Sequence, residues 1–111
     1  MNWYVVKIIF RIISNENGRR AQFDEQLRLV KAASKYMAFE KAGRLGRSVE
    51  LQYLNNSYNQ VKWQFVNVAE VNELNALEDG TELYCNIHEA PNADVYEGWT
   101  NHKAALISLD N

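Results

Sequence analysis

The residues best suited to chemistry lie near the carboxyl end of the sequence, around a single cysteine. The candidates are Cys85, His88, Glu89, Asp94 and His102. A metal site needs three or four ligands that converge on one ion. On a strand expected over residues 81–89, Cys85 and His88 point to opposite faces, because side chains alternate along a strand. We therefore predict no metal site, and we interpret Cys85 as a small buried residue and His88 as an exposed one.

The same cysteine is a poor candidate for nucleophilic catalysis. A cysteine nucleophile needs a histidine within hydrogen-bond reach, and the expected strand turns His88 away. No pair of titratable groups has the spacing for acid–base work. The glycines of GRLGR, residues 43–47, lack the preceding strand and following helix of a phosphate-binding loop. We predict that the protein is not an enzyme and has no catalytic residue, no cofactor-binding residue and no metal.

Four aromatic and aliphatic residues are the candidates for contact with a partner. Trp99 lies in the segment EGWTNH, where no periodicity predicts its burial, and Tyr96 lies just before it. These two either fold back over the protein or belong to a contact surface, since aromatic residues are enriched at binding hot spots. Trp3 and Ile9 join them because they lie on the mixed face of the first expected strand.

Length and charge restrict the class of protein. The chain has 111 residues, 47% of them hydrophobic, which suits one globular domain over residues 1–111. Its 12 basic and 14 acidic residues give a net charge of −2, which argues against general nucleic-acid binding. Lys7 and Arg11 interrupt the apolar start, so we expect neither a signal peptide nor a membrane span, and we predict a cytoplasmic protein.

The first element expected is a strand over residues 3–13, WYVVKIIFRII, because it is rich in β-branched and aromatic residues. One of its faces is wholly apolar and consists of Tyr4, Val6, Ile8, Phe10 and Ile12. The other face is mixed and consists of Trp3, Val5, Lys7, Ile9, Arg11 and Ile13. A strand covered fully on one side and partly on the other has this pattern.

The next segment allows two interpretations. After a polar loop with a turn at Asn17-Gly18, we favour a strand over residues 26–32 and then a helix capped by Ser34. One long helix from Asp24 is the alternative. The apolar face of the helix has a spacing of i, i+4, i+7, and Gly46 is expected to end it. That face consists of Ala38, Ala42 and Leu45.

Alternation predicts more strands in the second half of the chain. Residues 48–54 and 60–68 are expected to form a hairpin, followed by short helical turns around residues 71–77 and a strand over 81–89. Residues 90–111 are expected to be an irregular tail that folds over the sheet or into a partner. The predicted fold is α+β, an antiparallel sheet of four to five strands with one main helix on one face, in the order β-β-α-β-β-β.

Four segments of the chain together resemble a known family. They are WYVVKIIF, LVKAASKYMAFEKA, VKWQFVNVAEVNEL and DGTELY. The chain is similar through these segments to the bacterial domain-of-unknown-function family 4288, over roughly residues 3–87. The resemblance implies a strand before the helix. It implies no activity, because the role of that family is itself unassigned.

Three functions remain as hypotheses. The first is a non-catalytic protein-interaction module, which could be a homodimer, because the mixed face of the first strand holds more apolar area than one helix can cover. The second is an immunity protein or antitoxin that neutralises a toxin through its acidic stretch. That stretch consists of Glu70, Glu73, Glu78, Asp79 and Glu82. The third is a small ligand-binding domain with a cleft between helix and sheet, lined by Tyr36, Arg44 and Tyr84.

Overall fold

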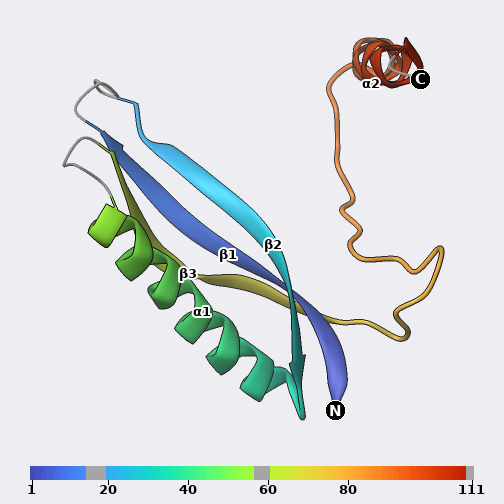
Figure 1. Cartoon of the computed structure of the whole chain (residues 1–111). Coiled ribbons are helices and arrows are strands. Elements are labelled where there is room, and N and C mark those ends of the chain that lie inside the picture. Colours follow the sequence, from blue (N-terminus) through green and yellow to red (C-terminus); the bar gives the residue numbers. More distant parts are fainter. Residues whose placement is uncertain (15–19, 57–60, 110–111) are drawn as a thin grey trace.

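The computed structural model describes residues 1–14, 20–56 and 61–109 and contains one sheet with a helix on one of its faces. The elements in chain order are β1 (Asn2–Ser14), β2 (Gln22–Ala32), α1 (Lys35–Asn56), β3 (Val61–Glu73) and α2 (Ala93–Leu109). The sheet is antiparallel with the order β2-β1-β3, and α1 lies along one of its faces (Figure 1). The predicted α+β class and antiparallel sheet are confirmed. The predicted turn at Asn17-Gly18 lies outside the described residues.

β1 is the central strand of the sheet, and its wholly apolar face meets α1. On the face that meets α1, the side chains of Val6, Ile8 and Phe10 are fully buried. Ala38 and Ala42 of α1 complete the same core, and they allow the helix to lie close to the sheet because their side chains are small. The core therefore lies between α1 and the β1–β3 side of the sheet.

The segment after the first loop is a strand followed by a helix, as favoured above. β2 pairs with β1 from Gln22 to Ala32, which excludes one long helix from Asp24. Ser34 caps α1, because its Oγ accepts a hydrogen bond of 3.2 Å from the backbone N–H of Met37. The prediction of the helix start is confirmed to the residue.

The predicted hairpin over residues 48–54 and 60–68 is wrong, because its first strand belongs to α1. The apolar spacing of Ala38, Ala42 and Leu45 continues to Val49 at i+11, and Val49 packs against the core. Over the few residues from 48 to 54, the same side chains also fit strand alternation, so the local pattern could not separate the two structures.

Gly46 does not end the helix as predicted; it lies inside α1 where the helix meets β3. A Cβ atom at this position would overlap the ring of Phe65 and lie 3.2 Å from Cγ2 of Ile8. Glycine is needed here because it removes the side chain from a close approach between helix and sheet.

The predictions for the last third of the chain are also wrong in three respects. Residue 71 lies in β3, which continues to Glu73, and no helical turns follow at 74–77. Residues 81–89 are irregular, so the described part of the chain has three strands, not four or five. The expected irregular tail contains α2 over Ala93–Leu109, and the order is β-β-α-β-α.

α2 begins directly after Pro91 and Asn92, two residue types that are common in turns and loops. The side chain of Asn92 accepts a hydrogen bond of 3.1 Å from the backbone N–H of Val95, which caps the helix. Pro91 lies at the end of the extended segment over residues 74–92, called the connector below, and Asn92 caps the helix that follows it. Among the described residues, α2 contacts no other helix or strand and contains no buried residue.

Candidate interaction surface

The face of the sheet opposite α1, called the far face below, is the candidate functional surface. Its β1 residues are those of the predicted mixed face, and the strand register places a β2 residue directly beside each of them from Trp3 to Arg11. Val5 pairs with Leu29, Lys7 with Leu27 and Arg11 with Phe23. Directly paired residues lie on the same face of a sheet, so three large apolar side chains of β2 point away from α1.

Those β2 side chains are exposed although they are apolar. Phe23 is 54% exposed, Leu27 50%, Leu29 44%, and Ile13 of β1 is 41% exposed. The opposite face of β2 is polar from Gln22 to Arg28, and there Asp24 accepts a hydrogen bond of 3.1 Å from Nε1 of Trp63. Only the end of β2 reaches the core, through Val30 and Ala32, so Phe23, Leu27 and Leu29 point away from the core that α1 forms.

Lys7 lies in the middle of the far face and is held by acidic neighbours. Its Nζ lies 2.9 Å from a carboxylate oxygen of Glu70 and 3.6 Å from one of Glu25. Tyr84 of the connector lies against it, with the ring centroid 5.0 Å from Nζ and the hydroxyl 3.4 Å away. The hydrogen bonds to Glu70 and Tyr84 raise the pKa of Lys7 well above its ordinary value, so the amine stays charged throughout the neutral range.

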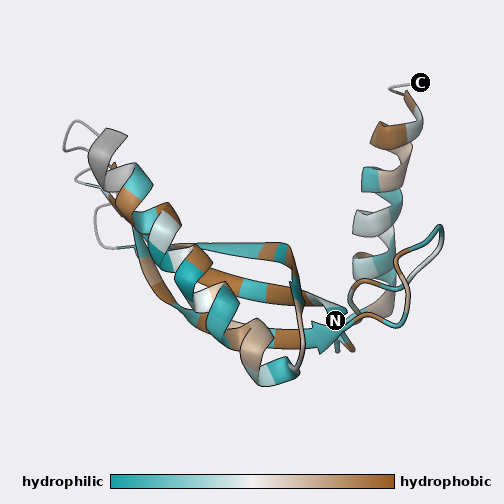
Figure 2. Cartoon of the chain, turned by 60° about the horizontal axis from the view of Figure 1, so that its bottom comes forward, coloured by the Kyte–Doolittle hydropathy of each residue, from teal (hydrophilic) through white to brown (hydrophobic). Residues whose placement is uncertain are grey.

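The four predicted contact residues fall into two separate groups. Trp3 and Ile9 are half-buried on the far face, and the ammonium group of Lys31 lies 5.2 Å from the Trp3 ring centroid. Tyr96 and Trp99 lie on α2, which stands apart from the sheet (Figure 2). The structure therefore does not bring the two pairs together within one chain.

Tyr96 and Trp99 belong to an amphipathic helix that the sequence interpretation missed. Apolar or aromatic positions recur along one side of α2 at i, i+4, i+7, i+11 and i+14. This α2 stripe consists of Val95, Trp99, His102, Leu106 and Leu109. All five are exposed, and the ammonium of Lys103 at the edge of the stripe lies 3.8 Å from the Trp99 ring centroid.

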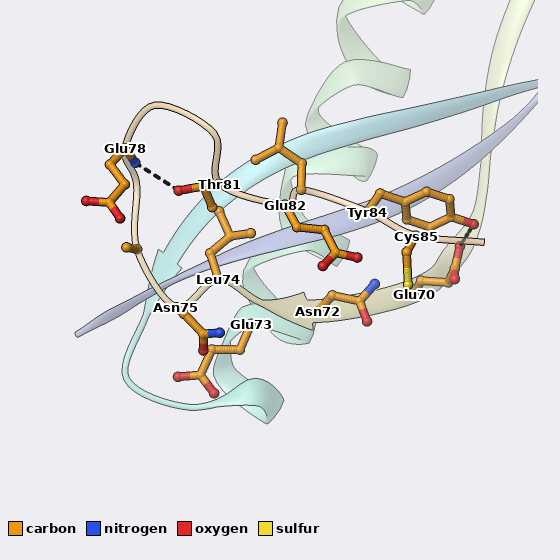
Figure 3. A pocket seen from close by; sticks show the side chains of 12 residues that line it. Glu70, Asn72, Glu73, Leu74, Asn75, Glu78, Thr81, Glu82, Tyr84 and Cys85 are labelled. Atoms are coloured by element: carbon orange, nitrogen blue, oxygen red, sulfur yellow. Dashed lines mark hydrogen bonds between the residues drawn. The ribbon is translucent and has the colours of Figure 1, made fainter. Parts of the chain in front are cut away.

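Cys85 is exposed, which corrects its interpretation as a buried residue. The strand that would have buried it does not form. Instead Cys85 lines an acidic hollow of about 400 Å³ between the end of β3 and the connector, where Glu70, Glu73 and Glu82 also lie (Figure 3). A hydrogen bond with Glu82 and the negative charge of its carboxylate raise the pKa of the Cys85 thiol, which disfavours the reactive thiolate.

The other chemistry-bearing residues do not form a common site. Tyr36 and Arg44 are exposed on α1, whereas Tyr84 lies on the far face beside Lys7, so these three residues do not line one cleft. Within residues 1–14, 20–56 and 61–109, no three His, Cys, Asp or Glu side chains come close enough to hold a metal ion. No helix in this part of the chain combines the length and the apolar character of a membrane span.

The sequence interpretation missed Phe23, Leu27 and Leu29 as members of the surface. The signal was present, because these residues alternate with the polar Asp24, Gln26 and Arg28. Val30 interrupts this alternation because it lies on the same side as Arg28, and the pattern could not say which face α1 would cover.

Fold and surface define a small α+β protein, an antiparallel β2-β1-β3 sheet with one helix packed on it and an apolar far face. The model of the domain of unknown function DUF4288 matches residues 3–85. The chain belongs to this family, as its resemblance implied, and α2 lies beyond the matched region. No curated protein and no solved structure matches the chain.

Proposed function

We propose that this protein is a non-catalytic protein-interaction module that associates with a second copy of itself through the far face. The observation that carries the proposal is the row of exposed apolar side chains on that face. Contiguous apolar patches of this kind are rare on monomers and mark interaction surfaces. The polar groups that converge on this face, at Lys7, pair with one another, and the exposed apolar side chains beside them suit association better than catalysis.

The exposed area of the whole chain supports the proposal. The surface area is 8946 Å². A compact monomer of this mass has about 6,300 Å², so the chain exposes roughly 2,600 Å² more than expected. A standard interface buries about 800 Å² on each partner. α2 contributes to this excess because it has no buried residue and contacts no other helix or strand, and the excess exceeds what one interface of standard size would bury.

The two alternative functions have less support from the geometry. A toxin-neutralising protein would use the acidic hollow, where carboxylates of Glu70, Glu73 and Glu82 gather, to hold a basic partner. A ligand-binding cleft would need Tyr36, Arg44 and Tyr84 on one side of the sheet, and they lie apart.

The first test is the mass of the protein in solution. We expect size-exclusion chromatography with light scattering to give twice the mass of the chain at tens of micromolar. The double substitution Leu27→Glu and Leu29→Glu should give a monomer, because the new carboxylates would have to be buried in the interface. The matched control is the double substitution Tyr36→Glu and Met37→Glu, which places the same charge on two exposed residues of α1 and should leave the dimer intact. A wild-type chain that stays monomeric at 100 µM contradicts the proposal.

A further inference from the structure

We propose that α2 of one copy packs on the far face of the second copy, so that two chains exchange their carboxyl-terminal helices. This inference rests on the proposed function and names the occupant of the surface. A reciprocal exchange of identical elements gives a closed, twofold-symmetric dimer and is a low-cost route to association.

α2 requires a partner that its own chain does not provide in the structure. It is 17 residues long and contains no buried residue. Most helical stability in proteins comes from packing of an apolar face rather than from helix propensity. The α2 stripe is such a face, and it is exposed along its whole length.

The chain before α2 directs the helix away from its own sheet. Rings of His88 and Tyr96 lie 5.3 Å apart, and Asn92 caps the helix between them, which forms a local elbow over residues 88–96. Tyr84 is held on the far face by Lys7 and Glu70. Only residues 85–87 separate this anchor from the elbow, and three residues span at most about 10 Å. In the structure α2 contacts no part of its own sheet, and packing α2 on its own far face would require residues 85–87 to change conformation.

The extended shape of the chain agrees with an α2 that packs on a second copy and not on its own sheet. The radius of gyration is 17.7 Å, whereas a compact domain of this length has about 13 Å. Figures 1 and 2 both show α2 separated from the sheet and joined to it by the connector alone. The compact unit would form only when a second copy receives the helix.

The two surfaces match in length, polarity and charge. α2 is about 25 Å long at 1.5 Å per residue. The exposed row on β2 from Phe23 to Leu29 spans about 20 Å at 3.3 Å per residue. Glu25 lies within this row with a side chain that is 63% exposed. Lys103 lies at the edge of the α2 stripe and supplies the opposite charge.

The test compares full-length variants of the two surfaces. The helix variant carries Trp99→Glu and Leu106→Glu, and the sheet variant carries Leu27→Glu and Leu29→Glu. We expect each variant alone to be monomeric, with a dimer Kd raised at least about 100-fold. The matched control is Ala104→Glu, which lies on the opposite side of α2 from the stripe and should leave the dimer intact.

Mixing the two variants gives the decisive measurement. A mixed pair contains one intact α2 and one intact far face, so one of the two exchange contacts can form. We expect native mass spectrometry of the mixture to detect a heterodimer, while neither variant forms a homodimer. Circular dichroism and urea unfolding of each variant establish that the α1–sheet core is folded, because all four substituted side chains are exposed.

The outcomes separate this inference from the proposed function. A dimeric helix variant beside a monomeric sheet variant overturns the exchange and leaves self-association through the far face standing. Two monomeric variants that do not form a heterodimer overturn the exchange as well, because the contact is then not helix on sheet. A monomeric wild-type chain overturns both the exchange and the proposed function. If hydrogen exchange then shows that the amides of α2 are protected in the monomer, α2 covers the far face of its own chain.

Discussion

At the scale of the residue, two glycines of α1 have opposite roles. Gly46 faces Phe65 of β3, where any side chain would meet the ring. Gly43, one turn earlier, would bring a new Cβ to 3.4 Å from the flexible end of Arg47 and into contact with no backbone atom. The same residue type therefore permits close packing at one position and only weakens the helix at the other.

Substitution by alanine should separate these roles. Gly46→Ala should lower the free energy of unfolding by about 1–3 kcal/mol, because the methyl group overfills the contact with Phe65. Gly43→Ala should raise it by about 0.5–1 kcal/mol, because alanine has the higher helix propensity. Urea unfolding of both variants checks the pair, and an equal effect at the two positions would contradict the packing described for Gly46.

At the scale of the element, the main finding is the length of α1. It continues through residues that alternate like a strand, because Val49 extends the apolar face of the helix onto the core while Leu51 points to solvent and is 62% exposed. In the expected hairpin, Val49 and Leu51 would have shared one face. The contact of Val49 with the core and the exposure of Leu51 therefore distinguish the helix from the expected hairpin.

Substitution of Val49 and of Leu51 by alanine tests whether residues 48–54 form a helix or a strand. Val49→Ala should lower the free energy of unfolding by about 1–2 kcal/mol, since it removes two methyl groups from a partly buried contact. Leu51→Ala should change it by less than about 0.5 kcal/mol, because the side chain is exposed. Equal and large losses in urea unfolding would favour the strand.

At the scale of the whole molecule, the β2 side of the far face is exposed, whereas Val5 on the same face is buried, and α2 adds a second uncovered apolar surface. Both surfaces lie in one chain, and the elbow at residues 88–96 keeps them apart. The molecule is extended because its two apolar surfaces do not meet.

Association at this scale predicts a thermal stability that depends on protein concentration. If the folded unit is a dimer, Tm should rise by roughly 5 °C for a hundredfold increase in concentration, because mass action favours the associated state. Thermal unfolding followed by circular dichroism from 1 to 100 µM measures the change. A Tm that stays constant over this range would indicate that unfolding does not involve dissociation.

Sequence patterns alone determined the first strand, the start of α1 at Ser34, the antiparallel α+β class and the family. These features depend on local composition and periodicity, which a single chain displays directly. The tertiary structure decided the rest: that residues 48–54 continue a helix, that Gly46 is a contact point, and that Phe23, Leu27 and Leu29 lie on an open face. Short apolar patterns fit a helix or a strand equally well, and only the packing of α1 against β1 and β3 decides which side chains are covered.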